Sequence, residues 1–357
     1  MINHSASHVL AADFDYIRGI VERNYVGPGV LCEELRQQLA SRFERPAVTL
    51  ADSGTAALHL CLAALAAKEP RKSRVLVGAY VCPEVISAVM RAQLVPVLVD
   101  CRTDSMNVDM SAMSGKLDAS TLAVICTGIG GAPDDIAATA DWNVAVISDC
   151  AQAVGARVGG RDVASSGSCT ILSFGPTKML SAGAGGAFLG DEQLGRDVAA
   201  LAGTELTVEE YKRSGFRPTY GQHMSDLTAG LAAAQLQRLD AMVGRRREIA
   251  AAYDRAVQGH ADVTLVPKAD LVKSNRFRYY FFSESAGTWV AHLRTRDIDA
   301  RRSIAHVIPE YLGDSSAYPN LLRLAPQLVS VPIFPAMTVG QADFVAEMLD
   351  LGPKSKL

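Results

Sequence analysis

Residues 53–55 combine a helix start with two hydroxyl groups. Ser53, Gly54 and Thr55 follow an apolar run typical of a strand and open a run typical of a helix. The free N–H groups and positive end of a helix N-terminus suit a phosphate, and Gly54 would let the backbone approach it closely. Ser or Thr before a helix is also a common cap. Taken alone, the three residues leave both interpretations open.

A carboxylate stands at the end of another apolar run. Asp149 closes the stretch VAVISD, at the expected carboxyl end of a strand. Ligands of open α/β sheets bind at that edge of the sheet. The carboxylate could pair with a protonated ring nitrogen or with a ribose hydroxyl, or it could cap the next turn. Its position makes Asp149 a candidate ligand contact.

A lysine follows a tight turn after a third apolar run. In SFGPTK, residues 173–178, Gly175 and Pro176 make the turn and Lys178 lies just beyond it. A lysine beside such a turn at a sheet edge could act as a Schiff-base nucleophile. Most lysines are instead solvated surface charges. The lysine therefore needs support from the rest of the chain.

A glycine-rich stretch suggests a different cofactor. In VICTGIGGAPDD, Gly128, Gly130 and Gly131 follow an expected strand, and Asp149 comes later in the chain. This order is similar to a dinucleotide-binding fingerprint, although Pro133 stands where the third glycine should be. An NAD(P)-dependent dehydrogenase is therefore kept as an alternative.

Strands and helices alternate through the first half of the chain and must position these residues. Strands are expected at 47–51, 74–77, 95–100, 122–126, 144–149, 169–174 and 186–189. Helices are expected at 55–67, 83–92, 134–139 and 192–202. Several of the strands are apolar throughout, as in a sheet covered on both faces. The fold class is therefore α/β, with a mixed, mostly parallel sheet.

The second half of the chain has a different pattern. Leucines and alanines recur at helical spacing over residues 225–259, where we expect one long helix with a break near Gly244. A smaller α+β unit should follow. Its strands are expected at 276–282 and 329–332 and its last helix at 340–351. We predict a large domain over 1–245, including an N-terminal arm, and a small C-terminal domain over 246–357.

Composition excludes several classes of protein. Of the 357 residues, 49% are hydrophobic and 20% are charged, a balance that is ordinary for a soluble enzyme. A net charge of −3 without a polybasic block argues against nucleic-acid binding. The apolar run at 56–67 is too short to span a membrane. Seven cysteines without a CxxC pair favour reduced thiols and a cytoplasmic location, and the dispersed histidines predict no metal site.

Several segments, in order along the chain, resemble the DegT/StrS-type sugar aminotransferases, a branch of the fold-type I pyridoxal-phosphate (PLP) enzymes. DSGTAALHLCLAAL is similar to the family's phosphate-binding turn, and AYVCPEVISAVMRAQLVPVLVDC to its cofactor-face segment. SDCAQAVGA matches DxAQAxG, and SFGPTKMLSAGAGGAFL matches SFxPSKxLxxGxGGA. VPIFPAMT is similar to a late LPxFPxLT strand. The resemblance covers nearly the whole chain.

The resemblance implies a fold-type I transferase and a role for each candidate. Lys178 would carry the cofactor as a Schiff base and move the proton, and Asp149 would keep the pyridine nitrogen protonated. Gln152 would lie near the ring hydroxyl. The implied cofactor-binding set is Ser53, Gly54, Thr55, Cys82, Asp149, Gln152, Ser173 and Lys178, with Lys178 as the catalytic residue. The active site would be shared between the two subunits of a homodimer.

Four positions depart from the family pattern. Cys82 stands where an aromatic residue usually stacks on the cofactor ring, with Tyr80 two residues before it. Thr127 replaces a histidine, Gly221 replaces the asparagine that reaches the partner's phosphate, and Ala184 replaces an acidic residue. None of these changes removes the Schiff-base chemistry. They affect the substrate site, the stacking contact and the contacts between subunits.

The function expected from this resemblance is amino-group transfer. Glutamate or glutamine would donate the amino group, and a keto group, foremost on a nucleotide-linked sugar, would accept it in ping-pong fashion. A cyclitol or another natural-product ketone is an alternative acceptor. A second alternative is a non-catalytic partner subunit with a PLP-enzyme fold. Related dehydratases replace the lysine with histidine, so Lys178 argues against an elimination.

Overall fold

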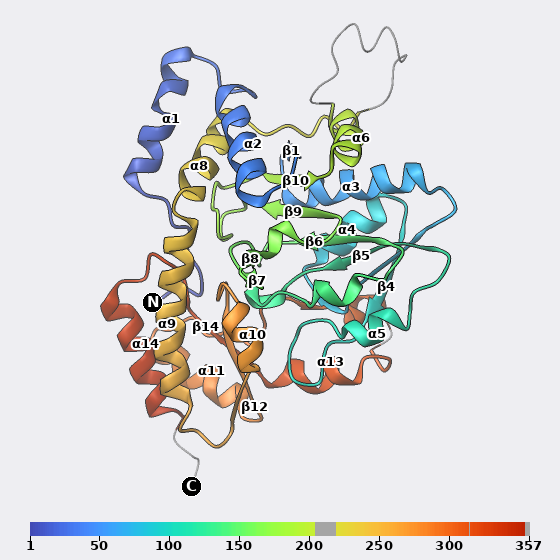
Figure 1. The fold of residues 1–357 in the computed structure, drawn as a ribbon. Coiled ribbons are helices and arrows are strands. Elements are labelled where there is room, and N and C mark those ends of the chain that lie inside the picture. Colours follow the sequence, from blue (N-terminus) through green and yellow to red (C-terminus); the bar gives the residue numbers. More distant parts are fainter. Residues whose placement is uncertain (204–218, 314, 354–357) are drawn as a thin grey trace, which may run out of the picture.

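A seven-stranded sheet forms the centre of the larger part of the molecule (Figure 1). The computed structural model describes residues 1–203, 219–313 and 315–353. The strands lie in the order β1-β10-β9-β6-β5-β2-β4. Their bounds are β1 (Ala47–Ala51), β2 (Arg74–Gly78), β4 (Val95–Val99), β5 (Thr121–Cys126), β6 (Ala145–Asp149), β9 (Cys169–Ser173) and β10 (Gly186–Gly190). Each corresponds to a strand expected from the sequence.

The sheet is mixed and mostly parallel. The strands from β9 to β4 pair in parallel, and only β10 runs antiparallel, to both β9 and β1. Successive side chains of a strand point to opposite faces, and here both faces are covered. Ile171 packs into the core beneath one helical layer and Leu172 into the core beneath the other. The predicted fold class is confirmed.

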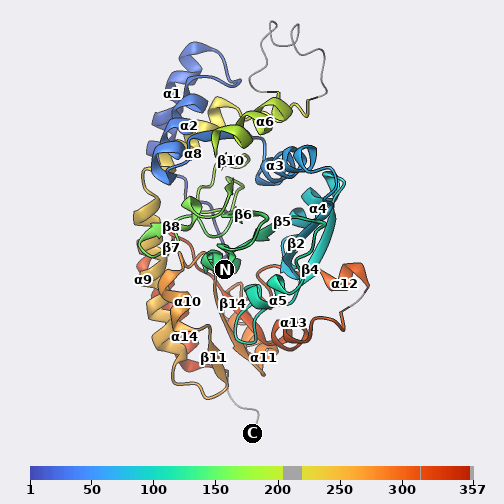
Figure 2. The same cartoon turned by 45° about the vertical axis from the view of Figure 1, so that its right-hand side comes forward.

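Two helical layers enclose this sheet (Figure 2). One contains α3 (Gly54–Lys68), α4 (Pro83–Arg91) and α6 (Glu192–Ala202). The other contains α2 (Val30–Phe43) and α8 (Asp226–Leu236), with α1 (Ala11–Arg23) packed against α8. The helix α3 is apolar on nearly all sides, because it lies between the sheet and its neighbours α4 and α6. Within the described chain, no helix combines the length and apolar character needed to cross a membrane.

The long helical segment is broken, but not where the sequence suggested. It forms α8 and then α9 (Leu239–Val257), separated at Gln237 and Arg238. The Arg238 side chain turns toward the N-terminal region, where Nη2 lies 2.7 Å from a carboxylate oxygen of Asp13. The predicted break near Gly244 is wrong. An added Cβ at Gly244 would meet no atom within 4 Å, so no neighbour forces α9 to bend there.

A three-stranded antiparallel sheet organises the C-terminal part. It contains β11 (Val263–Leu265), β12 (Tyr279–Ser283) and β14 (Leu328–Val331), packed against α9, α11 (Ala286–Arg294) and α14 (Val339–Leu351). The strand expected from residue 276 begins at Tyr279. The reason is that Asn275 and Arg278 donate their backbone N–H groups to Gly131 and Gly130 instead of to a strand. The division of the chain near residue 245 remains a prediction, and that residue lies inside α9.

Short elements complete the connections. The helices are α5 (Met110–Ser114), α10 (Lys268–Lys273), α12 (Pro309–Leu312) and α13 (Pro319–Leu324). The strands are β3 (Tyr80–Val81), β7 (Arg157–Val158), β8 (Arg161–Asp162) and β13 (His306–Val307). The helix expected over residues 134–139 is only a 3₁₀ turn at Ile136–Thr139. The Asp134 carboxylate turns inward instead, and accepts hydrogen bonds from the N–H groups of Thr127 and Gly128.

The N-terminal segment reaches from the smaller sheet to the lysine turn. Ile2 forms a bridge with Ile298, and the ring of buried His4 lies 2.9 Å from the hydroxyl of Ser330 in β14. Further along, the Ser7 hydroxyl donates to the carbonyl of Pro176. The first residues of the chain therefore connect the two parts of the fold beside the candidate site.

Candidate active site

The predicted residues meet at the carboxyl edge of the parallel strands. Asp149 ends β6, Ser173 ends β9 and Thr127 follows β5, so the three side chains lie along one edge. A cavity of about 380 Å³ opens there. It is lined by Gly54, Thr55, Leu58, Val81, Cys82, Glu84, Val85, Thr127, Ile129, Asp149, Ala151, Gln152, Ser173, Gly175, Pro176 and Lys178. All the residues predicted to bind the cofactor except Ser53 belong to this set.

The start of α3 forms one wall of the cavity. An added Cβ at Gly54 would lie 2.8 Å from Cβ of Ser173, so only glycine lets the helix start so close to the end of β9. Ser53 serves a different purpose. Its hydroxyl accepts from the N–H of Ala56 at 3.1 Å, which is an ordinary helix cap. Free N–H groups of the first helical turn thus face the cavity beside the hydroxyls of Thr55 and Ser173.

Asp149 is a buried carboxylate on the cavity wall. Only 6% of its surface is exposed, and Oδ1 accepts a hydrogen bond from the N–H of Ala151 at 3.0 Å. Burial raises the pKa of Asp149 above its ordinary value, whereas the hydrogen bond from Ala151 and the charge of Lys178 lower it. A carboxylate placed in this way is well suited to accept a hydrogen bond from a protonated ring nitrogen.

Lys178 is held by the turn that precedes it. Its backbone N–H donates to the carbonyl of Gly175 at 3.0 Å, and its own carbonyl accepts from the hydroxyl of Ser181 at 2.7 Å. The side chain is half-buried and lines the cavity. Its Nζ lies 6.0 Å from the centre of the Phe277 ring. The amine therefore faces the same cavity as Asp149 and the start of α3.

Cys82, and not Tyr80, lines the cavity. Tyr80 is only 3% exposed, and its hydroxyl accepts from the N–H groups of Ile304 at 2.9 Å and Ala305 at 3.1 Å. The thiol of Cys82 lies 3.8 Å from Nε2 of Gln152. Burial raises the pKa of Cys82, so its thiol stays neutral. The position that carries an aromatic ring in the resembled family is thus taken here by a smaller, neutral side chain.

The glycine-rich loop has a packing role that the sequence did not reveal. An added Cβ at Gly131 would lie 1.9 Å from Oδ1 of Asn275, and the loop leads into a 3₁₀ turn without a long helix. Gln152 Oε1 accepts from the N–H of Gly130 at 2.9 Å. The Asn275 side chain donates to the carbonyl of Gln152, also at 2.9 Å. The loop joins the cavity wall to the C-terminal part and lacks the helix N-terminus that a dinucleotide needs.

The segment Asn275–Arg278 was not singled out by motif or spacing. Phe277 lies near Lys178, and Arg278 packs on the Phe277 ring, with Cζ 4.5 Å from its centre. These residues come from a part of the chain about 100 positions after the lysine, and only the fold brings them close. Gly221 does not line the cavity.

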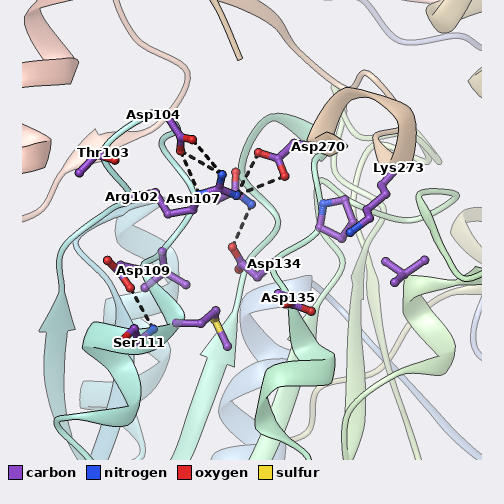
Figure 3. Close-up of a pocket in the computed structure, with 14 residues that line it drawn as sticks. Arg102, Thr103, Asp104, Asn107, Asp109, Ser111, Asp134, Asp135, Asp270 and Lys273 are labelled. Atoms are coloured by element: carbon purple, nitrogen blue, oxygen red, sulfur yellow. Dashed lines mark hydrogen bonds and ion pairs between the residues drawn. The ribbon is translucent and has the colours of Figure 1, made fainter. Parts of the chain in front are cut away.

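A second pocket, next to α5 and α10, is polar (Figure 3). The guanidinium of Arg102 lies between the carboxylates of Asp104 and Asp270, at 3.0 and 3.1 Å. Asn107 donates to Asp134 at 2.9 Å, and Asp134 in turn holds the turn after β5. These charged and polar groups pair with one another, and through Asp134 they support the loop after β5. Among the described residues, no group of three or more His, Cys, Asp or Glu side chains could hold a metal ion.

Comparison with known proteins identifies the family. The sequence model of the DegT/DnrJ/EryC1/StrS aminotransferase family matches residues 10–350. EpsN of Bacillus subtilis (strain 168), whose name describes a pyridoxal phosphate-dependent aminotransferase, is 28% identical over 287 residues, 76% of this chain and 73% of EpsN. GDP-perosamine synthase of Vibrio cholerae is 23% identical over 340 residues, 90% of this chain and 91% of that enzyme.

Solved structures agree with this comparison. The sugar aminotransferase CalS13 of Micromonospora echinospora superposes with a TM-score of 0.89 at 22% identity, covering 99% of this chain and 100% of CalS13. AtS13 of Actinomadura melliaura superposes with a TM-score of 0.88 at 25% identity, covering 99% of each chain. Fold and sequence therefore lead to the same conclusion: the chain belongs to the DegT/DnrJ/EryC1/StrS aminotransferase family.

Proposed function

We propose that this aminotransferase uses PLP to move an amino group from glutamate or glutamine to a keto group on a nucleotide-linked sugar. The observation that carries the proposal is the convergence of Lys178, Asp149 and the start of α3 on one cavity of about 380 Å³. An amine, a buried carboxylate and a helix start with room for a phosphate are three contacts well suited to PLP.

The residues of the cavity fit the cofactor chemically. The glycine at position 54 leaves room for phosphate oxygens at the helix start, where hydroxyls of Thr55 and Ser173 would add hydrogen bonds. The carboxylate of Asp149 is shielded from water and would pair with the protonated pyridine nitrogen. Gln152 would lie at the ring edge. When bound, PLP supplies an electron sink for the substrate carbon, which no side chain of the protein can provide.

The chain's own side chains would perform the remaining steps. Lys178 would hold the cofactor covalently and, once displaced by the amino donor, move a proton to and from the substrate carbon. Asp149 would keep the ring nitrogen protonated throughout both half-reactions. Burial of the carboxylate on the apolar cavity wall strengthens that ion pair relative to one in water.

A nucleotide-linked sugar is the acceptor that the relatives favour. The curated relatives include GDP-perosamine synthases of Vibrio cholerae and Escherichia coli O157:H7, the latter matching 94% of both chains at 24% identity. These names describe enzymes that act on nucleotide sugars. A cyclitol or another natural-product ketone remains the alternative acceptor, and a panel of keto compounds offered to the aminated enzyme would separate the two.

Cofactor attachment tests the proposal directly. The protein is incubated with PLP, reduced with borohydride and digested, and the labelled peptide is identified by mass spectrometry. We expect the label on Lys178, no label in Lys178→Ala, and normal labelling in Lys273→Ala, whose exposed side chain lies in the second pocket. An unlabelled Lys178 in the wild-type protein would refute the proposal.

Amino-group transfer separates an enzyme from a non-catalytic subunit. Glutamate or glutamine added to the PLP-loaded protein should convert the cofactor to its amine form and release the corresponding keto acid. Bound cofactor that no amino donor converts would favour the non-catalytic alternative. Measurable binding of NAD(P) in calorimetry would instead revive the dehydrogenase alternative.

We further propose a homodimer with shared active sites. Large apolar side chains are exposed in α1, in the connection that follows it and at the start of α2, including Phe14 (58%), Tyr25 (57%), Val26 (57%) and Val30 (63%). Exposed apolar residues grouped in this way are typical of a protein interface. Sedimentation should reveal a dimer that Val26→Glu/Val30→Glu converts to monomers. A wild-type monomer at micromolar concentration would contradict this proposal.

A further inference from the structure

An arginine with one buried nitrogen that has no partner among the described residues lies next to the candidate active site. Arg278 is half-buried overall, and its Nη1 atom is inaccessible to solvent. Within the described parts of the chain, Nη1 has no hydrogen-bond partner and the side chain forms no ion pair. Buried charges in proteins are normally paired, because removing them from water is costly. A ligand that brings a negative charge would satisfy this requirement.

The position of Arg278 connects it to the cavity wall. Its backbone N–H donates to the carbonyl of Gly130, whose own N–H donates to the cavity residue Gln152. Its guanidinium packs on the Phe277 ring at 4.5 Å, and Lys178 Nζ lies 6.0 Å from the centre of the same ring. The guanidinium of Arg278 and the amine expected to carry the cofactor therefore both lie near the same aromatic ring.

Two neighbouring arginines have partners for their Nη atoms, which Nη1 of Arg278 lacks within the described residues. Arg246 is fully buried, but its Nη1 donates to the carbonyls of Phe277 at 2.9 Å and Ile333 at 2.7 Å. Arg301 is exposed and pairs with Asp299 at 2.7 Å. For Arg278, the described residues provide neither a carbonyl acceptor for Nη1 nor an ion-pair partner. Burial and the charge of Arg301 lower the pKa of Arg278 to about 10, so it remains charged at neutral pH.

We propose that Arg278 binds the α-carboxylate of the amino-acid donor, an inference that rests on the proposed function. In an α-amino acid the carboxylate is attached to the carbon that bears the reacting amine. It would therefore lie within a few bonds of the place where the donor amine displaces Lys178, which is the region that Arg278 adjoins. The phosphates of a nucleotide sugar are several bonds further from the reacting carbon. A guanidinium also matches a carboxylate with two parallel hydrogen bonds.

His4 would support this carboxylate site from the N-terminal segment. Its Nδ1 is buried and has no partner within the described chain, while its Nε2 lies 2.9 Å from the Ser330 hydroxyl. The backbone N–H of His4 donates to Asp299 at 3.2 Å, and Asp299 pairs with Arg301, so His4 lies beside these charged groups. Burial lowers the pKa of His4 to about 3, so the neutral ring adds no competing charge.

The test compares donor recognition with cofactor access. Two rates are measured for each PLP-loaded protein. The first is conversion of the cofactor by L-glutamate, and the second is release of the cofactor by hydroxylamine, which has no carboxylate. The proteins are the wild type, Arg278→Gln, Arg278→Lys and Arg301→Gln. We expect Arg278→Gln to raise the KM for glutamate roughly 10- to 100-fold, the effect of losing a charge-assisted hydrogen-bond pair. The hydroxylamine rate should stay within about twofold of wild type.

The two control variants make the result specific. Arg278→Lys keeps the charge without the forked geometry and should fall between wild type and Arg278→Gln. Arg301→Gln removes an equal charge nearby and should leave the KM for glutamate unchanged. An unchanged KM in Arg278→Gln, or an equal loss of the hydroxylamine rate, would overturn the inference. A wild-type protein that binds no PLP would instead refute the proposed function itself.

Discussion

Adding one methyl group at Gly54 tests the predicted phosphate site at its closest contact. The Cβ of an alanine there would lie 2.8 Å from Cβ and 3.1 Å from Oγ of Ser173, and 3.2 Å from the carbonyl of Leu172. Real Cβ atoms essentially never approach another atom to 2.8 Å, so the helix start or the end of β9 must move. Overpacking of this kind costs about 1–3 kcal/mol.

We expect this cost to appear in cofactor binding. The two elements that separate, α3 and β9, supply the groups that would hold the phosphate, so Gly54→Ala should weaken PLP binding roughly 5- to 150-fold. The dissociation constant is measured by titrating the apoprotein with PLP and following absorbance. Gly244→Ala is the matched control, because nothing lies within 4 Å of the added methyl group. That variant should bind PLP normally and gain about 0.5–1 kcal/mol in stability.

A double variant identifies the contact responsible. Ser173→Gly removes the two nearest atoms, so the Leu172 carbonyl at 3.2 Å becomes the nearest. Loss of the Ser173 hydroxyl should weaken PLP binding by itself. In the double-mutant cycle, however, Gly54→Ala should cost at least about 1 kcal/mol less when Ser173 is already glycine. Binding by Gly54→Ala within twofold of wild type, or a cycle without coupling, would refute this account of the site.

Three further predictions concern the charge, the pH response and the shape of the site. Asp149→Asn should still bind PLP but slow its conversion by glutamate about 10- to 100-fold in stopped-flow measurements, because the ring nitrogen loses an ionic partner; an unchanged rate would contradict this role. Burial, with help from Arg278 and Arg301, lowers the pKa of His4 from 6.5 to about 3. Docking of the N-terminal segment should thus be strongest above pH 6.5 and weaken as pH falls toward 3, by up to about 1.4 kcal/mol per pH unit. Hydrogen exchange of this segment should show that slope in wild type but not in His4→Gln; equal slopes would exclude His4 as the cause. Cys82→Phe should tighten PLP binding about two- to tenfold by ring stacking, and weaker binding measured in the same titration would mean that the cavity is too narrow for a ring.

Local pattern was sufficient to predict the large sheet. All seven of its strands lie where apolar runs predicted them, because most positions of strands covered on both faces are apolar. The helix expected over 192–202 is α6, which begins at Glu192 and ends at Ala202. Asp191 caps its start, and the left-handed Gly203 ends it, so both signals are local. Such features depend on neighbours in the sequence and are visible without the fold.

Predictions that depended on distant contacts were less successful. The helix break near Gly244 was wrong, because the break lies at Arg238, whose partner Asp13 is more than 200 positions away. The helix expected from residue 134 was cut to one 3₁₀ turn, because the carboxylate of Asp134 is used by the loop after β5. A side chain's local preference is weak compared with the burial and hydrogen bonds that the fold imposes.

For the candidate site too, some residues were predicted from the sequence and others were placed only by the fold. The motifs around Lys178, Asp149 and Gly54 indicated the family and its chemistry from the sequence alone, because each motif is a short local structure that ends at the sheet edge. Only the tertiary structure excluded Tyr80 from the cavity, because its hydroxyl accepts hydrogen bonds from the N–H groups of Ile304 and Ala305. It also brought the unpaired guanidinium of Arg278 next to the lysine. No local pattern encodes these placements, since they arise where segments from both halves of the chain pack together.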